Sequence, residues 1–467
     1  MGSGYGIFIK NRKGRGRRVP HGENMHLWKD FVRYASLSML GMFGLSCYIL
    51  ADTFFVAQGV GETGLAALNL TIPAYNLMNG VALLIGMGGA IRYSVFRSRG
   101  EQEKADGAFT GAILLAFFFS VLFMLAGGFG SGLLGRLLGA DKETFSMTNT
   151  YLFVLWLFSP VFLFSTTLMC FVRNDGAPAT AMLATLSGSL ANVVLDYILV
   201  FPCGLGMLGA VLATGCSPLF GLCFSAWHIL RGKNGFHLRR AAAPVRHWGR
   251  IFSLGFPFFV EQLSSAVVII TFNYLFLGLS GNTGVAAYGV VANVSLVALS
   301  LFNGVAQGTQ PLLSRARGKG EASQSRTVLR YALFSVLGLS ALLYALLFFF
   351  AAPVSDIFNS EHSAALREIA VRGLRLYMIA MPFAGVNILL CAAFSAQERA
   401  LPAQIVSLLR GLIVILPSAF ILCALFGETG LWLAFPVCEA LVCAVAVCIL
   451  ALPALLRRKA AGGMQKF

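Results

Sequence analysis

The sequence predicts an all-α polytopic membrane protein whose twelve transmembrane helices form two pseudo-symmetric six-helix lobes. Three observations predict this fold class. The composition is too apolar for a soluble protein, the apolar residues form twelve runs of membrane-spanning length, and the second half of the chain repeats the first.

The composition excludes a soluble enzyme and a disordered chain. Of 467 residues, 57% are apolar (AVILMFWYC) and 12% are charged. Soluble domains have about 45–50% apolar residues even with Gly included, and about 25% charged residues. A soluble globule of this composition would expose large apolar patches. The ten cysteines lie mostly within apolar runs, without a Cys-x-x-Cys pair, so we expect neither a metal site nor a disulfide.

The apolar runs are long enough to be membrane-spanning helices. A helix needs about 20 apolar residues to cross about 30 Å of hydrocarbon. The twelve runs are 33–56, 65–91, 109–127, 150–171, 179–200, 208–229, 251–277, 285–310, 328–350, 376–394, 404–425 and 430–456. They are continuous and do not alternate with polar residues, which excludes the strands of a membrane barrel.

The positions of Lys and Arg predict the orientation. With the N-terminus inside, the cytoplasmic segments contain 29 Lys and Arg, and the outer segments contain five. Cytoplasmic loops of membrane proteins are enriched in these residues, so we expect both termini in the cytoplasm. The net charge of +16 is then a property of loops and tails, and we expect no nucleic-acid partner.

The chain repeats itself when position n is set against position n + 220. Gly61–Ala67 falls on Gly281–Ala287, and Gly100 falls on Gly320. Each half contains six runs, an even number, so the two halves point the same way and are related by an axis along the membrane normal. Such repeats are typical of secondary transporters, with the cavity between the halves. The expected domains are a basic leader (1–32), an N-lobe (33–230), a linker (231–250), a C-lobe (251–456) and a tail (457–467).

Four acidic residues lie inside predicted spans, where charge is expensive. They are Asp52, Asp196, Glu261 and Glu439. A carboxylate at the centre of a span costs about 2.5–3.5 kcal/mol or more, so it should face a cavity and have a partner. Removal from water also favours the protonated form of an acid. A carboxyl group placed in this way can take up and release protons, as a proton-driven exporter requires.

Five polar residues of the N-lobe are predicted to share one depth, near the outer ends of four spans. Asp52 is on the first span, Tyr151 on the fourth, Asn192 and Asp196 on the fifth, and Thr214 on the sixth. Asn192 and Asp196 are four residues apart and therefore lie on one helix face. The alternative is that these are separate interfacial residues, because Tyr is common at helix ends near the headgroups.

The C-lobe lacks matching acids. Asp52 plus 220 is Phe272, with Asn273 next to it, so the proton site is expected in the N-lobe alone. Glu261 follows Pro257 by one turn and is expected to line the C-lobe half of the cavity. Glu439 is expected to form a structural ion pair with Arg410.

The sequence resembles the multidrug and toxic compound extrusion (MATE) family over nearly all of residues 28–456. Four segments carry the resemblance: Ala51–Ala57 (ADTFFVA), Arg173–Pro178 (RNDGAP), Asn192–Tyr197 (NVVLDY) and Gly206–Thr214 (GMLGAVLAT). The resemblance implies twelve helices in two lobes that form a V. It also implies export of cationic or amphipathic compounds by alternating access, driven by H⁺ or Na⁺.

The resemblance to the proton-coupled branch of the family implies a proton-binding site, whose residues can be assigned one by one. An acid of span 1, a Tyr of span 4, an Asn and an Asp of span 5 and a Thr of span 6 fall on Asp52, Tyr151, Asn192, Asp196 and Thr214. There are departures from the family pattern. Relatives with a C-lobe cation site carry a Glu in span 7, and this position is Ser265 here. These relatives also carry an acid in span 10, which is absent here; Ala384 and Asn387 are the nearest residues. The proline of the first span is also missing.

We therefore expect a proton-coupled antiporter and not an enzyme. Asp52, Asp196, Asn192, Tyr151 and Thr214 would couple protons to transport, and Glu261, Asn273 and Asn387 would line the substrate cavity. We expect no cofactor and no metal, with H⁺ as the coupling ion and Na⁺ as the alternative. The expected partners are small cationic or amphipathic substrates and the lipid bilayer, and the expected form is a monomer in the plasma (bacterial inner) membrane. The alternatives are a flippase for lipid-linked oligosaccharides and a membrane-bound transferase.

Overall fold

The computed structural model describes residues 21–239, 245–359 and 363–463, and the regular structure in these segments is helical. The first half forms α1 (His21–Gly59), α2 (Glu62–Ser98), α3 (Gln102–Leu137), α4 (Phe145–Leu157), α5 (Ser159–Asn174), α6 (Pro178–Val200) and α7 (Gly206–Leu230). The second half forms α8 (Val245–Lys319), α9 (Ala322–Phe349), α10 (Ala351–Phe358), α11 (Ala364–Tyr377), the 3-10 turn η1 (Met378–Ala380), α12 (Met381–Ala396), α13 (Ala400–Leu408), the π-helical turn η2 (Leu409–Ile413) and α14 (Ile415–Gly463).

Twelve membrane crossings can be traced through the described residues. Nine helical stretches are long and apolar enough to cross a membrane, and α4 with α5, bent by 49°, supplies one more. Two of the nine stretches, Trp248–Lys319 and Ala400–Ala451, contain 72 and 52 residues. At about 1.5 Å per residue, each is long enough for two crossings. Their chains turn at Gly281 and Gly427, whose φ angles of 62° and 60° lie in the left-handed region that glycine tolerates.

The fourth predicted span differs from the structure in one respect. The run 150–171 was expected as a single helix, but the helix breaks at Phe158, between α4 and α5. Pro160, in the first turn of α5, lacks the backbone N–H that would continue the preceding helix. The span is therefore a bent pair of helices, and the N-terminal residue of α5, Ser159, is buried.

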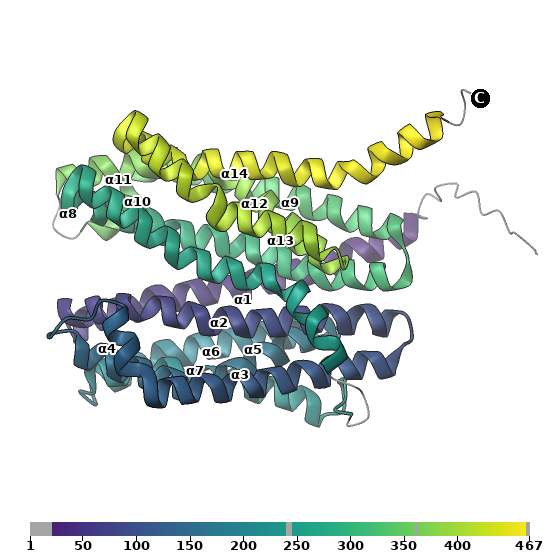
Figure 1. Ribbon diagram of the computed structural model, residues 1–467, viewed down its shortest axis with the longest axis horizontal. Coiled ribbons are helices and arrows are strands. Elements are labelled where there is room, and N and C mark those ends of the chain that lie inside the picture. The colour runs from purple at the N-terminus through teal and green to yellow at the C-terminus, as the bar shows by residue number, and fades with distance from the viewer. Residues whose placement is uncertain (1–20, 240–244, 360–362, 464–467) are drawn as a thin grey trace, which may run out of the picture.

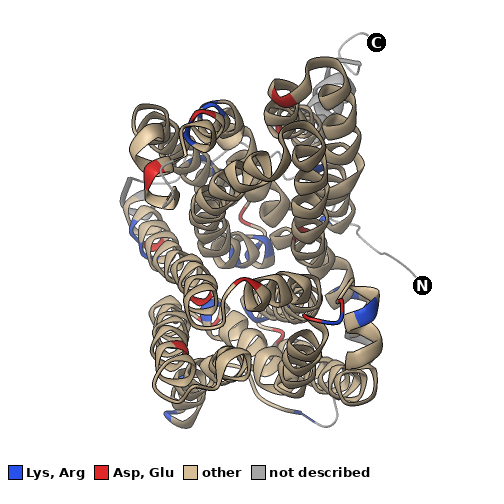
Figure 2. Ribbon diagram, turned by 90° about the vertical axis from the view of Figure 1, so that its left-hand side faces the viewer, with Lys and Arg blue, Asp and Glu red and all other residues tan. Residues whose placement is uncertain are grey.

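The two lobes lie side by side and share the repeat that the sequence predicts. Figure 1 shows α1–α7 as one bundle and most of α8–α14 as the other. Figure 2 looks along the helices, and shows few charged positions in either bundle. Gly61 and Gly281, which correspond in the repeat, both have positive φ angles, of 83° and 62°. Gly100 and Gly320 also correspond, with φ angles of 77° and 72°.

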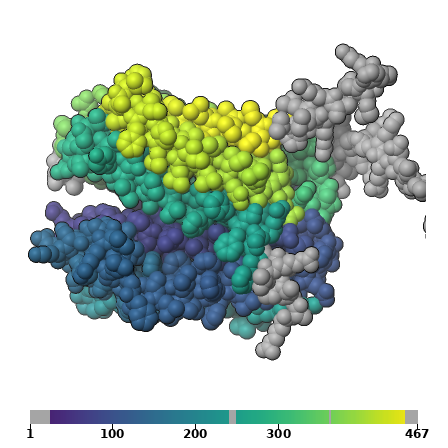
Figure 3. All heavy atoms as spheres, in the orientation of Figure 1, coloured from purple at the N-terminus to yellow at the C-terminus, as the bar shows by residue number. Residues whose placement is uncertain are grey.

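The lobes are closed at one end, which we call the basic end because Arg92, Arg99 and Arg315 gather there. Both described ends of the chain, at the start of α1 and the end of α14, also lie at this end (Figure 1). Several side-chain hydrogen bonds between the lobes lie here, including Arg315 to the Tyr34 hydroxyl at 2.8 Å and Asn174 to Gln310 at 3.0 Å. Figure 3 shows a groove between the lobes at the opposite end, which carries α4 and α11.

Two symmetry-related glycines allow this closure. A Cβ atom on Gly88 would lie 2.1 Å from the carbonyl oxygen of Ile251, which belongs to the other lobe. A Cβ atom on Gly308, the equivalent position of the second half, would lie 2.5 Å from the carbonyl oxygen of Tyr34. Both contacts are to backbone, which cannot move aside as a flexible side chain can. The sequence repeat therefore reappears as a pair of equivalent close approaches across the lobe boundary.

We expect Gly88→Ala to open the basic end. The added methyl group overpacks a backbone contact, at a cost of about 1–3 kcal/mol. The midpoint of thermal unfolding of the purified protein should fall by several degrees. Gly130→Ala is the matched control, because no atom lies within 4 Å of a Cβ at that helical position. Equal midpoints for the two variants would show that the glycine contact does not hold the lobes together.

Candidate functional site

The five polar residues predicted in the N-lobe meet inside that lobe. Asp52 is on α1, Tyr151 on α4, Asn192 and Asp196 on α6, and Thr214 on α7. Helix α6 packs against both α1 and α7, which brings the residues together. Asn192 and Asp196 are fully buried, and the exposed fractions of Tyr151 and Thr214 are 3% and 4%. We call these five residues the N-lobe polar cluster.

The sequence of α6 explains which side chains point inward. Ser189, Asn192 and Asp196 recur at intervals of three and four residues, and all three are buried. Leu190 and Val194 lie on the opposite face and are exposed, as is expected for side chains in contact with lipid. The helix period of 3.6 residues thus separates an inner polar stripe from an outer apolar one.

The carboxyl groups of Asp52 and Asp196 lie close enough for their charges to interact. No Lys, Arg or His among the described residues forms an ion pair with either of them. Two carboxylates can hydrogen-bond only if one of them carries a proton, because both are otherwise acceptors. Two negative charges at this distance also repel each other strongly when buried. The arrangement therefore favours a pair that shares one proton.

The cluster contains polar atoms that have no partner within the described protein. These atoms are Asp52 Oδ1, both side-chain carboxyl oxygens of Asp196, both amide atoms of Asn192, and Thr214 Oγ1. The Tyr151 hydroxyl lies near Thr214 and is close to both carboxyls. Buried polar groups are almost always paired in folded proteins, so a group of unpaired atoms in one place indicates a site for a ligand, ion or water.

Two tyrosines beside the cluster were not identified from the sequence. The hydroxyl groups of Tyr48 and Tyr75 are 3.1 Å apart, and both tyrosines are close to Asp52. Tyr48 precedes Asp52 by four residues on α1, so the same periodicity that pairs Asn192 with Asp196 could have found it. Tyr75 comes from α2, and only the packing of the helices places it there.

A second polar cluster lies in the C-lobe around Arg410. The guanidinium group of Arg410 contacts Glu439 at 2.7 Å and Glu261 at 3.9 Å. The predicted Arg410–Glu439 pair is therefore present, and Glu439 is 1% exposed. Glu261 is the more accessible acid, with a side chain that is 29% exposed, and it accepts a hydrogen bond from Asn303 at 3.0 Å. One positive and two negative groups give the C-lobe cluster a net negative charge.

The remaining predicted cavity residues occupy different environments. Asn273 is partly exposed on α8. Asn387 is fully buried, and its amide nitrogen donates to the Glu439 carboxylate at 2.7 Å and to the Glu439 backbone carbonyl at 2.9 Å. Asn387 thus belongs to the ion-pair network in this conformation. Across the described residues, no three His, Cys, Asp or Glu side chains form a group that could hold a metal ion.

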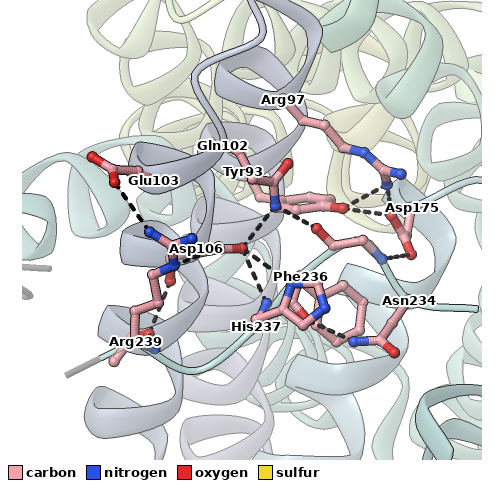
Figure 4. Close-up of polar contacts among 12 residues, drawn as sticks. Tyr93, Arg97, Gln102, Glu103, Asp106, Asp175, Asn234, Phe236, His237 and Arg239 are labelled. Atoms are coloured by element: carbon pink, nitrogen blue, oxygen red, sulfur yellow. Dashed lines mark hydrogen bonds and ion pairs between the residues drawn. The ribbon is translucent and has the colours of Figure 1, made fainter. Parts of the chain in front are cut away.

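The segment after α7 is bound to the N-lobe by two buried acids that lie outside the predicted spans (Figure 4). The Asp175 carboxylate accepts the backbone N–H of Gly235 at 2.8 Å and forms an ion pair with Arg97. Asp106, 1% exposed, accepts the backbone N–H of His237 at 3.1 Å. Phe236 packs among aromatic rings of α2, α3 and α5 and is 1% exposed. We call residues 231–239 the strap.

Comparison with known proteins gives consistent results. A family model described as MatE matches residues 38–198 and 257–421. The chain is 25% identical over 430 residues to a protein of Staphylococcus saprophyticus named multidrug export protein MepA, with 92% of this chain and 94% of that protein covered. It is also 25% identical over 423 residues to a FAD transporter of Shewanella oneidensis, with 86% and 89% covered.

The fold is also similar to that of solved structures. One of them is the outward-facing conformation of a multidrug resistance MATE family transporter, with a TM-score of 0.86 and 22% identity. The alignment covers 94% of this chain and 97% of that one. Similarity of this degree shows that the folds agree, including the division into two lobes.

Proposed function

Because the chain belongs to the MatE family, we propose that it is a secondary active antiporter that exports cationic or amphipathic compounds in exchange for protons. The basic end would face the cytoplasm, with both termini inside and the groove of Figure 3 open to the outside of the plasma membrane. The protein would need no cofactor and would act as a monomer.

The Asp52–Asp196 pair carries the proposal of proton coupling. The two carboxyls are close to each other, Asp196 is fully buried, and no basic side chain of the described protein compensates their charge. Such a pair changes its charge when it gains or loses a proton, and it titrates as one unit. A change in charge at one place in the N-lobe is the chemical requirement for coupling a proton to movement of a cation.

The transport cycle follows from the charge of this pair. Toward the cytoplasm, where protons are scarcer, the deprotonated pair would attract a cationic compound. Toward the outside, proton uptake would remove the negative charge and release the compound. The net negative charge of the C-lobe cluster, in which Glu261 is partly exposed, also supports a cationic cargo.

The test is export of the fluorescent cation ethidium from proteoliposomes that contain the purified protein. A pH gradient alone, acidic on the outer side, should drive export, whereas a sodium gradient alone should not. A collapse of the pH gradient by an ionophore should stop it. Export driven by the sodium gradient alone would show that the coupling ion is Na⁺ and not the proton. Export driven by neither gradient would contradict ion-coupled export of this cation.

An anionic cargo is the second candidate, and one residue favours it. Arg173 is 4% exposed at the boundary between the lobes, and its hydrogen-bond partner across that boundary is the neutral Gln307. A buried guanidinium group without a carboxylate is costly, and an anion would compensate it. Because one relative is named a FAD transporter, FAD is the probe. Export of FAD under the same pH gradient, lost in Arg173→Gln, would support this candidate over the first.

A further inference from the structure

Glu398 joins the two lobes at the basic end. It lies between α12 and α13 of the C-lobe, and its carboxylate forms ion pairs with two N-lobe residues, Arg92 of α2 and Arg99, which directly follows α2. The Arg92 pair is also a direct hydrogen bond, and the Arg99 nitrogen lies 3.4 Å from the carboxylate. The Glu398 side chain is only 9% exposed. It is therefore a largely buried charge whose partners come mainly from the opposite lobe.

Further arginines surround the same residue from its own lobe. Arg317 of α8 lies 4.0 Å from the Glu398 carboxylate. Arg250, also of α8, donates a hydrogen bond to the backbone carbonyl of Glu398 at 2.8 Å. A single carboxylate thus stands among four guanidinium groups. No other acid forms an ion pair with Arg92 or Arg99 among the described residues, so Glu398 is the ion-pair partner of both.

The backbone of Glu398 is held in an unfavourable conformation. Its φ angle of 60° makes it the one non-glycine residue in the left-handed region among the described parts of the chain. Residues other than glycine adopt this region at a cost, and do so where the surrounding structure enforces it. In the N-lobe, the corresponding turn between α5 and α6 uses Gly176, with a φ angle of 106°. Only the C-lobe turn carries an acidic side chain at this position.

The repeat shows what is special about the C-lobe turn. In the N-lobe, Arg97 pairs with Asp175, and this acid binds the strap within its own lobe (Figure 4). In the C-lobe, the arginine at the equivalent position of the repeat is Arg317, and it approaches Glu398. The Arg97–Asp175 pair stays within one lobe, whereas Glu398 reaches across to the other. The same structural element thus stabilises one lobe in the first half and joins both lobes in the second.

We propose that Glu398 is an ion-pair latch that keeps the basic end closed in the outward-facing state. When the lobes separate at this end, Arg92 and Arg99 move away with the N-lobe, and Glu398 keeps Arg317. Opening therefore removes the ion-pair partner of two N-lobe arginines, and this cost stabilises the closed arrangement. The latch acts on the position of the lobes, and it does not depend on which compound or ion is transported.

The experiment measures opening of the basic end by hydrogen–deuterium exchange of the full-length protein in lipid nanodiscs. Glu398→Gln keeps the size and the backbone preference of the side chain but removes its charge. Backbone exchange in residues 92–100 and 171–177, which lie at the closed boundary, should become about tenfold faster, within the range of typical conformational couplings. Arg92→Gln should accelerate exchange in 171–177 as well, because it removes the latch from the other lobe.

Two further variants separate the effect of the Glu398 charge from the effect of backbone strain and of charge removal in general. Glu103→Gln is the matched control, because Glu103 is 86% exposed and pairs with Arg239, away from the boundary between the lobes. Residues 92–100 and 171–177 of this variant should exchange at the wild-type rate. Glu398→Gly removes the carboxylate and also relieves the backbone strain, so it should exchange as fast as Glu398→Gln. Slow exchange in Glu398→Gly would mean that strain, and not charge, controls the boundary.

The exchange rates of Glu398→Gln and Arg92→Gln show whether the proposed latch exists. Wild-type exchange in Glu398→Gln overturns the latch. Fast exchange in Glu398→Gln with wild-type exchange in Arg92→Gln also overturns it, because a bridge between lobes must need both partners. If Glu398→Gln does not fold, the Arg92→Gln result decides alone. Because exchange is measured without cargo or ion gradients, a failure of proton-coupled export would leave this result unaffected.

Discussion

Asp196→Asn should reduce pH-driven ethidium export to the rate of vesicles without protein. The asparagine is close in size to aspartate, but it cannot gain or lose a proton, so the pair with Asp52 loses one of the two groups whose coupled titration would follow the gradient. In the unaltered protein, affinity for the cation should rise with pH, because deprotonation creates the negative charge. In the variant this pH dependence should be much weaker. Initial export rates and ethidium binding, measured across pH, test both expectations.

The control for this prediction is another acid of the same lobe. Glu62→Gln removes a carboxyl group at the start of α2, where the residue is exposed to solvent. It should export ethidium at the wild-type rate. Asp52→Asn should behave as Asp196→Asn does. If either asparagine variant retains full pH-driven export, the assignment of the proton site to this pair is wrong.

Arg410→Met should destabilise the protein more than any surface substitution. It leaves Glu439, which is 1% exposed, as a buried acid without its cation. Breaking a buried pair from one side costs about 3–5 kcal/mol, because the remaining charge is not compensated. The free energy of unfolding, followed by denaturant titration in detergent micelles, should fall by about this amount.

The double variant separates the ion pair from simple loss of packing. Arg410→Met with Glu439→Gln removes both charges, and should recover much of the lost stability. Arg372→Met is the surface control, because Arg372 is 51% exposed and its ion-pair partner among the described residues is Glu368 on the same helix. Exposed pairs of this kind contribute about 0.2–1 kcal/mol. A loss below about 1 kcal/mol for Arg410→Met, the level of an exposed pair, would show that the C-lobe cluster is well hydrated.

Most of the fold could be predicted because the membrane imposes simple rules on the sequence. Each predicted run coincides largely with observed helical structure, since only an apolar helix satisfies its backbone in lipid. The repeat was readable because its turns require glycine at Gly61 and Gly281. The bend at Phe158 was missed, because proline occurs within other helices of this chain, such as α2 and α7, that remain continuous.

The candidate site was predictable only where residue type was rare for its position. An acid inside a span is conspicuous, so Asp52 and Asp196 were found, and the structure brings them together. Tyrosine is common in membrane helices, so Tyr75 gave no signal. Asp175 and Glu398 were treated as ordinary loop residues, because burial of a loop acid depends on segments that are distant in sequence. Their role follows from tertiary packing alone.

The docking of the strap on the N-lobe limits how far the lobes can move apart. Arg239 is held by its backbone N–H to Thr110 and by its side chain to Asp106, and α8 begins at Val245. Six peptide units link these two points, and at about 3.3–3.6 Å per residue they reach about 22 Å at most. This short connection between the strap and α8 sets an upper limit on how far these two points can separate during any rocking motion of the lobes.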